Sequence, residues 1–188
     1  MRTALFGGTF DPIHHGHLIL AREAMEQLAL DRVVFVPAAL SPHKLARQPA
    51  PPGLRLQMVR AAIAGEPGFE CDGSETEQAG PSFTVDTVTA WRKNAPDDEL
   101  YYLIGQDNVR ELPTWRHYEE LRRMVRFVVF ERDAHAPAHD FPRVLRRVDI
   151  SATDLRKRVA QGRSIRYLVP EPVRAIIETH QLYQGGTH

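Results

Sequence analysis

Short apolar runs alternate with longer stretches of helical periodicity along this chain. Thr3 to Phe6 is apolar and ends at two glycines, which predicts a buried strand followed by a loop. Apolar residues then recur at helical spacing between Leu18 and Leu28, and Val33 to Val36 form a β-branched and aromatic run that Pro37 ends. The first third of the chain therefore predicts a strand, a helix and a second strand.

The same alternation continues to the end of the chain. It predicts helices near residues 54–64, 85–93, 152–160 and 170–180, and strands near 69–71, 99–104, 127–130 and, more weakly, 144–148. Strand-helix-strand units place their strands parallel through right-handed crossovers. We therefore expect an α/β fold with a mainly parallel central sheet flanked by helices. A length of 188 residues favours a single domain over residues 1–188.

The composition indicates which partners and which cellular compartment to expect. The 24 basic and 24 acidic side chains cancel, which argues against a dedicated nucleic-acid binder. Cys71 is the sole cysteine, so an intrachain disulfide and a zinc site of several thiolates are excluded. The apolar runs are too short for a signal-peptide core or a membrane span. We expect a cytoplasmic protein without a membrane or nucleic-acid partner, either monomeric or homo-oligomeric.

The strongest motif is Gly7-Gly8-Thr9-Phe10-Asp11-Pro12-Ile13-His14-His15-Gly16-His17, between the first strand and the first helix. Ligands of parallel α/β sheets bind beyond the carboxyl ends of strands, and a helix N-terminus offers free amides to phosphates. His14 and His17 lie three residues apart, so both can donate hydrogen bonds to one phosphate group.

A second motif, Ile150-Ser151-Ala152-Thr153-Asp154-Leu155-Arg156, follows a predicted strand and begins a helix. Ser151 as N-cap with Asp154 at the third helical position resembles a capping box, which explains both residues without any ligand. Arg156 adds a planar set of donors that suits phosphate oxygens.

Two further segments carry weaker signals. Lys44 lies in the proline-rich loop from Pro37 to Gly53, where its ammonium could reach a phosphate, although a lone loop lysine is more often solvated. Thr84 begins a predicted helix, and its hydroxyl is expected to cap that helix.

The strand from Glu99 to Ile104 leads into Gly105-Gln106-Asp107, and Trp115 follows a short turn. Asp107 could accept from a ribose hydroxyl, and the Trp115 indole offers a flat apolar face, although a single tryptophan is more often core. We assign Trp91 to packing.

Other candidate sites are weaker. His135 and His139 have Pro137 between them and no evident third metal ligand, so we expect exposed loop histidines and no metal site. The chain lacks both the Gly-x-x-x-x-Gly-Lys-(Ser/Thr) loop and the Gly-x-Gly-x-x-Gly fingerprint, which argues against a P-loop NTPase and a Rossmann dinucleotide cofactor.

His14-His15-Gly16-His17 resembles the (His/Thr)-x-Gly-His signature of adenylyl- and cytidylyltransferases, and the run from Gly7 to Leu18 is similar to bacterial nicotinate mononucleotide adenylyltransferases. The resemblance extends from Thr3 to about His180. It implies a Rossmann-like nucleotidyltransferase fold and transfer of AMP from ATP to nicotinate mononucleotide, with Mg²⁺ bound through the ATP phosphates.

The resemblance also assigns residues to roles. Catalytic positions would be His14, His17, Lys44 and Arg156, and the nicotinate mononucleotide would contact Lys44, Thr84 and Trp115. ATP would be bound by Gly7, Gly8, Thr9, Phe10, His14, His17, Gly105, Asp107, Ile150, Ser151, Thr153 and Arg156.

Two alternatives to nicotinate mononucleotide adenylyltransfer remain. The acceptor could be nicotinamide mononucleotide, phosphopantetheine or a phosphorylated alcohol, and the chain could be a nucleotide sensor that has lost catalysis. Gln106 and Arg116 depart from the family pattern, in which a small residue and an aromatic residue are common, so they leave pyridine recognition open.

Overall fold

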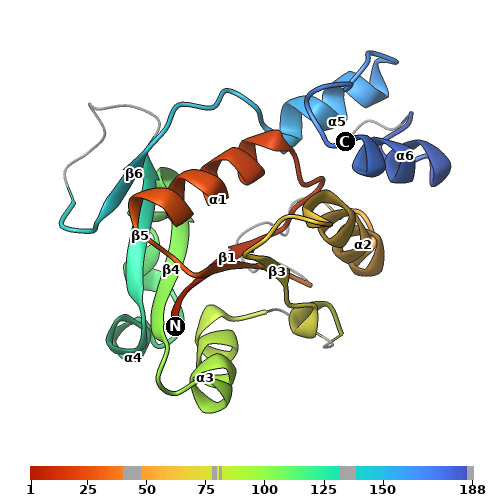
Figure 1. Cartoon of the computed structure of the whole chain (residues 1–188). Coiled ribbons are helices and arrows are strands. Elements are labelled where there is room, and N and C mark those ends of the chain that lie inside the picture. Colours follow the sequence, from red (N-terminus) through yellow and green to blue (C-terminus); the bar gives the residue numbers. More distant parts are fainter. Residues whose placement is uncertain (40–47, 78–79, 81, 132–138, 186–188) are drawn as a thin grey trace.

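A computed structural model of the chain has a parallel sheet at its centre (Figure 1). The structure describes residues 1–39, 48–77, 80, 82–131 and 139–185. In this part of the chain, six strands pair in the order β3-β2-β1-β4-β5-β6, and every pairing is parallel. The strands are β1 (Arg2–Gly8), β2 (Arg32–Pro37), β3 (Phe69–Cys71), β4 (Glu99–Gly105), β5 (Arg126–Glu131) and β6 (Arg143–Leu145).

Helices cover both faces of the sheet (Figure 1). One face is packed by α1 (His15–Gln27) and α2 (Pro52–Ile63); α5 (Ala152–Ala160) and α6 (Glu171–Thr179) add apolar residues to the same core, and α6 packs against α2. The other face is packed by α3 (Thr84–Asn94) and α4 (Tyr118–Met124). Short 3₁₀ turns lie at Ser74–Glu77, Gln106–Asn108 and Leu112–Thr114.

Burial on both faces explains why the strands are almost continuously apolar. Along β1, Ala4 and Phe6 belong to the core under α1, whereas Leu5 belongs to the core under α3. Side chains alternate between the faces of a strand, so a strand covered on both faces needs apolar residues at successive positions. The short apolar runs of the sequence are therefore the central strands.

The predicted α/β class and mainly parallel sheet are confirmed, with two local differences. The weak strand expected at 144–148 is shorter and shifted, since β6 spans Arg143–Leu145. Helix α4 was not predicted, because its seven residues contain only one buried apolar side chain, Leu121, which is too little to show a helical period.

The strand order is 3-2-1-4-5-6. Strands β2 and β3 are added on one side of β1, whereas β4, β5 and β6 are added on the other, so the order switches between β1 and β4. In open parallel sheets this switch point opens a crevice beyond the carboxyl ends of the two strands, and ligands bind there. β1 ends at Gly8 and β4 ends at Gly105, so two of the sequence-predicted motifs begin at this crevice. Among the described residues, no helix has the length and apolar character needed to cross a bilayer.

Candidate active site at the switch point

The two histidines of the first motif lie against each other at the start of α1. His14 is the N-cap residue, and its ring is stacked on that of His17 with centroids 3.7 Å apart and an interplanar angle of 24°. The His14 backbone N–H donates to Nδ1 of His17 at 3.2 Å. This bond fixes the tautomer of a neutral His17, because Nδ1 must accept, so Nε2 carries the proton and is a donor.

Gly16 is required by the packing of the His14 ring. A Cβ at position 16 would lie 2.9 Å from Nδ1 and 3.0 Å from Cε1 of His14, and 3.3 Å from Cγ1 of Val148. Contacts this short would move the ring. The glycine between the histidines therefore allows His14 to lie over the first turn of α1.

Gly7 and Gly8 make room for aromatic side chains of the protein itself. A Cβ at Gly7 would overlap the Tyr102 hydroxyl, and one at Gly8 would lie 3.0–3.2 Å from three ring atoms of Phe10. The Phe10 ring then contacts the edge of His17, with centroids 5.0 Å apart. The packing of Tyr102 and Phe10 therefore requires glycine at both positions.

The second motif meets the first, although the two are far apart in sequence. Ser151 caps α5 as predicted, because its Oγ accepts from the Asp154 N–H at 3.1 Å. One turn later, Arg156 donates through Nη1 to the backbone oxygen of Asp11 at 2.8 Å and through Nη2 to Oγ1 of Thr153 at 3.1 Å. Arg156 is therefore held beside the loop that carries the histidines.

Asp11 joins that loop to two other segments. Its carboxylate Oδ1 accepts from the Tyr183 hydroxyl at 2.7 Å and from the Ala50 N–H at 3.1 Å, and the residue is buried. Sequence reasoning missed this role, since neither partner lies near Asp11 in the chain.

Arg55 is a second residue that sequence reasoning missed. Its side chain is fully buried and donates only to main-chain carbonyls in the described structure: Nε to Ala50 (2.9 Å), Nη1 to Thr9 and Ala38 (both 2.7 Å), and Nη2 to Ala39 (2.8 Å). Burial lowers the pKa of Arg55, and the charge of Asp11 partly offsets this.

A signal for Arg55 was present in the sequence. It shares the buried face of α2 with Met58, Val59 and Ile63, at helical spacing. A cation on the apolar face of an amphipathic helix is rarely buried without hydrogen-bond partners, so this pattern indicates a buried anchoring role.

Two further predicted residues, Thr84 and Trp115, lie near the buried Tyr102 of β4. Thr84 Oγ1 lies 3.3 Å from the Tyr102 hydroxyl, and the Trp115 ring meets the Tyr102 ring edge-on with centroids 6.0 Å apart. Burial raises the pKa of Tyr102 well above its ordinary range, so the hydroxyl stays protonated. The structure thus brings Thr84 and Trp115 to one side chain.

The expectation that Thr84 caps its helix was wrong. The N-cap of α3 is Phe83, with extended backbone, and Thr84 is the first helical residue. Its hydroxyl lies 3.3 Å from that of Tyr102 on β4 instead.

Gly105 is the last residue of β4, and Asp107 lies in the 3₁₀ turn that follows it. A Cβ at Gly105 would approach only the Asn108 side chain, at 4.0 Å, and Asp107 is exposed in the 3₁₀ turn that follows. Ile150 packs, partly buried, against the core under α1.

Comparison with known proteins places this geometry in a family. The sequence profile described as Cytidylyltransferase-like matches residues 5–158. A protein of Thermus thermophilus named "Probable nicotinate-nucleotide adenylyltransferase" is 43% identical over 98% of this chain and 100% of its own length. One of the same name from Rubrobacter xylanophilus is 42% identical over 98% and 93%. This chain belongs to the nicotinate-nucleotide adenylyltransferase family.

A solved structure of this kind has the same fold. The Plasmodium falciparum nicotinic acid mononucleotide adenylyltransferase complexed with NaAD matches with a TM-score of 0.75 and 17% identity, over 97% of each chain. At that identity the match concerns the fold alone. It agrees with the six-stranded parallel sheet found here.

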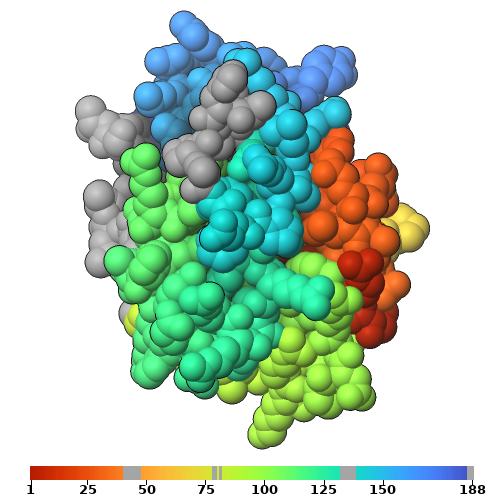
Figure 2. All heavy atoms as spheres, turned by 90° about the vertical axis from the view of Figure 1, so that its left-hand side faces the viewer, coloured from red at the N-terminus to blue at the C-terminus, as the bar shows by residue number. Residues whose placement is uncertain are grey.

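The segment after β6 packs along α1. Arg146 pairs with Glu23 of α1 at 3.1 Å, and Val148 lies beside Gly16. Figure 2 shows this segment in cyan beside α1 in orange. It therefore runs back along α1 toward the histidines before α5 begins.

Two of the remaining predicted residues lie outside the described part of the chain, namely Lys44 and His135. His139 corrects the expectation of an exposed histidine, because its side chain is only 6% exposed and Nε2 lies 2.9 Å from Oε1 of the buried Glu131. Its ring also packs against Phe141, with centroids 5.7 Å apart. Trp91 packs as predicted, beneath the Arg32 guanidinium.

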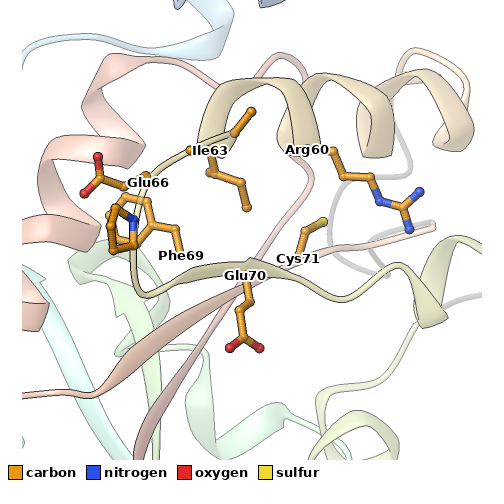
Figure 3. A pocket seen from close by; sticks show the side chains of 9 residues that line it. Arg60, Ile63, Glu66, Phe69, Glu70 and Cys71 are labelled. Carbon is orange, nitrogen blue, oxygen red and sulfur yellow. The ribbon is translucent and has the colours of Figure 1, made fainter.

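Two cavities of the described structure lie away from the histidines. The larger, of about 480 Å³, is formed by the end of α2 and by β3; Figure 3 shows Phe69 and Cys71 pointing toward α2 and Glu70 pointing away. Burial raises the pKa of the Cys71 thiol to about 11, so this cysteine is not a reactive thiolate. The other, of about 370 Å³, lies between α1 and α2. Neither cavity is lined by a predicted site residue.

No group of three or more histidine, cysteine or acidic residues in the described ranges could hold a metal ion. This concerns only a metal held by protein side chains, and leaves open a metal carried by a nucleotide.

Proposed function

We propose that the protein transfers AMP from ATP to nicotinate mononucleotide, giving nicotinate adenine dinucleotide and pyrophosphate in NAD biosynthesis. The observation that carries the proposal is the convergence of His14, His17 and Arg156 at the switch point, from two motifs far apart in the chain. Membership of the family, at about 43% identity over the whole chain, supports the choice of substrates.

ATP is proposed to bind along the ends of β1 and β4 and the start of α5. The set comprises Gly7, Gly8, Thr9, Phe10, His14, His17, Gly105, Asp107, Ile150, Ser151, Thr153 and Arg156. His17 offers its Nε2–H, the N-terminus of α1 adds its free amides, and Arg156 adds a positive charge. On the family resemblance, Lys44 is proposed as a catalytic residue that also contacts nicotinate mononucleotide.

The reaction needs no nucleophilic side chain. A phosphate oxygen of nicotinate mononucleotide attacks the α-phosphorus of ATP, a new P–O bond forms, and the bond to the pyrophosphate leaving group breaks in line. The attacking oxygen is already anionic near neutral pH, so no protein base is required. Catalysis then depends on positioning and on stabilising the developing charge, which suits histidine, arginine and helix-terminal donors.

Mg²⁺ is proposed to enter with ATP, where it would neutralise the phosphates while keeping most of its water ligands. The donors found at the site are imidazole, guanidinium and backbone N–H groups, which bind phosphate oxygens and not Mg²⁺. That donor set fits a metal carried by the nucleotide. A reducing cytoplasm is the proposed compartment.

The acceptor is proposed to bind beside Tyr102, with the pyridine ring against Trp115 and its acid group near Thr84. An indole face suits an electron-poor ring.

The test is pyrophosphate release from ATP and Mg²⁺ with nicotinate mononucleotide, nicotinamide mononucleotide or phosphopantetheine as acceptor. Strong release with the nicotinate substrate that His17→Ala abolishes supports the proposal. His180→Ala, at the exposed end of α6, is the matched control and is expected to remain active.

Preference for another acceptor would reject the proposed acceptor and keep the transferase chemistry. ATP binding with no turnover on any acceptor would favour a nucleotide sensor instead.

A further inference from the structure

Arg116 lies close in sequence and in space to the two residues proposed to contact the acceptor, Trp115 and Thr84. It follows Trp115 directly, and its guanidinium carbon lies 4.8 Å from the centroid of the Phe83 ring. Phe83 is the N-cap of α3 and immediately precedes Thr84. Arg116 is therefore the chain neighbour of Trp115, and its guanidinium lies over the chain neighbour of Thr84 at the start of α3.

The contacts of Arg116 hold its side chain without neutralising it tightly. Its Nη1 lies 3.9 Å from Oδ2 of Asp86, and the two side chains are 51% and 64% exposed. An ion pair that long and that exposed contributes little. Stacking on an aromatic face occupies the plane of a guanidinium and leaves its edge N–H groups available to a carboxylate.

We propose that Arg116 is a specificity-determining residue, which selects an acceptor with a carboxylated pyridine over one with a carboxamide. This inference rests on the proposed function and names a residue that enforces its choice of substrate. A carboxylate gains a charge-assisted hydrogen bond from the guanidinium, whereas a neutral carboxamide does not. Asp86 balances the charge of Arg116 until the acid group of the acceptor competes for it.

The first test measures binding alone, so that it does not depend on turnover. Titrations of wild type and Arg116→Gln with nicotinate mononucleotide and nicotinamide mononucleotide are followed by Trp115 fluorescence or calorimetry. We expect the variant to bind the nicotinate form about tenfold more weakly, as the loss of one charge-assisted hydrogen bond predicts. Binding of the nicotinamide form should change less than twofold.

Arg122→Gln is the matched control. Arg122 also lies over an aromatic ring, that of Tyr118 at 5.9 Å, and also pairs with an acidic residue, Glu119 at 3.7 Å, but it lies on α4. We expect the binding of both acceptors to be unchanged in this variant. Arg116→Lys keeps the charge and loses the planar donors, so its preference for the acid form should be intermediate.

The outcomes separate this inference from the proposed function. An equal loss of affinity for both acceptors in Arg116→Gln, no loss for either, or no binding of either by wild type would overturn the role of Arg116. Binding of the acid form that depends on Arg116, in a wild-type protein that releases no pyrophosphate, would keep the inference and reject the proposed activity.

Discussion

Charged side chains serve different purposes at the two ends of the sheet. At the amino ends of the strands they pair with one another: Asp98 binds the N-terminal ammonium at 3.1 Å and Arg32 at 3.0 Å, and Arg2 pairs with Glu99 at 3.1 Å. These pairs join the beginnings of β1, β2 and β4. Each of these cations has an acidic partner, so this end of the sheet serves stability.

At the carboxyl ends, two arginines bind the main chain instead. Each hydrogen bond described for Arg55 ends on a carbonyl oxygen, and Arg156 donates to the carbonyl of Asp11. These hydrogen bonds fix the loops at this end, and the buried Asp11 is the acidic partner, with Oδ2 3.9 Å from Nη1 of Arg156. The comparison predicts that substitutions at the amino ends affect stability alone, whereas those at the carboxyl ends also affect turnover.

The largest effect is expected from Arg55→Met, which removes the partner of four carbonyl oxygens in a buried setting. The free energy of unfolding should fall by about 4 kcal/mol, in the range of broken buried polar networks. Urea denaturation measures it, and Arg60→Met, on the exposed side of the same helix, is the control. A loss below about 1 kcal/mol would show that the carbonyls find other partners.

His17→Ala should act on turnover and leave the fold intact. Removing one donor to a developing charge lowers kcat by roughly 10² to 10³. Pyrophosphate release measures the rate, and thermal unfolding checks that the melting temperature changes little. Comparable losses of stability and rate would mean that His17 is a packing residue.

Acid titration tests the opposite end of the sheet. Burial opposes ionisation of Asp98, but hydrogen bonds from Thr3, the N-terminal ammonium and Arg32 outweigh it and lower its pKa from 3.8 to about 2. Because the folded-state pKa is depressed, the stabilisation is present above pH 4 and is lost as the pH falls toward 2.

The stabilisation from Asp98 should be about 2 kcal/mol. Comparing the pH dependence of unfolding in wild type and Asp98→Asn isolates it. Identical acid profiles would contradict the prediction, as would lost turnover at neutral pH in a folded variant.

The smallest effect is expected at Tyr102. Tyr102→Phe removes the hydroxyl beside Thr84 and should cost about 1 kcal/mol of stability. If Thr84 positions the acceptor, KM for nicotinate mononucleotide should rise a few fold with kcat nearly unchanged. Steady-state kinetics with each substrate varied separates this result from a change in KM for ATP.

Contacts between residues that are close in sequence could be predicted from the sequence. His14, Gly16 and His17 lie within one helical turn, so their spacing alone places them together. The buried strands were also predictable from the sequence, since burial on both faces requires continuous apolar runs.

Long-range partners were not predictable in this way. The expectation that a hydroxyl caps the helix was right for Ser151 and wrong for Thr84. The Thr84 hydroxyl contacts that of Tyr102 on β4 instead. The anchoring roles of Asp11 and Arg55 were missed because each depends on a carbonyl, amide or hydroxyl from a distant segment.

The hydrogen bond from Tyr183 to Asp11 can form only late in translation, because Tyr183 is made after every strand and helix of the described structure. A nascent chain that has emerged as far as β6 contains every strand of the sheet, but it lacks both Arg156 and Tyr183. Its first loop would then carry both histidines without its two C-terminal partners. The loop that carries the histidines thus gains its last described partner only when the segment after α6 has been made.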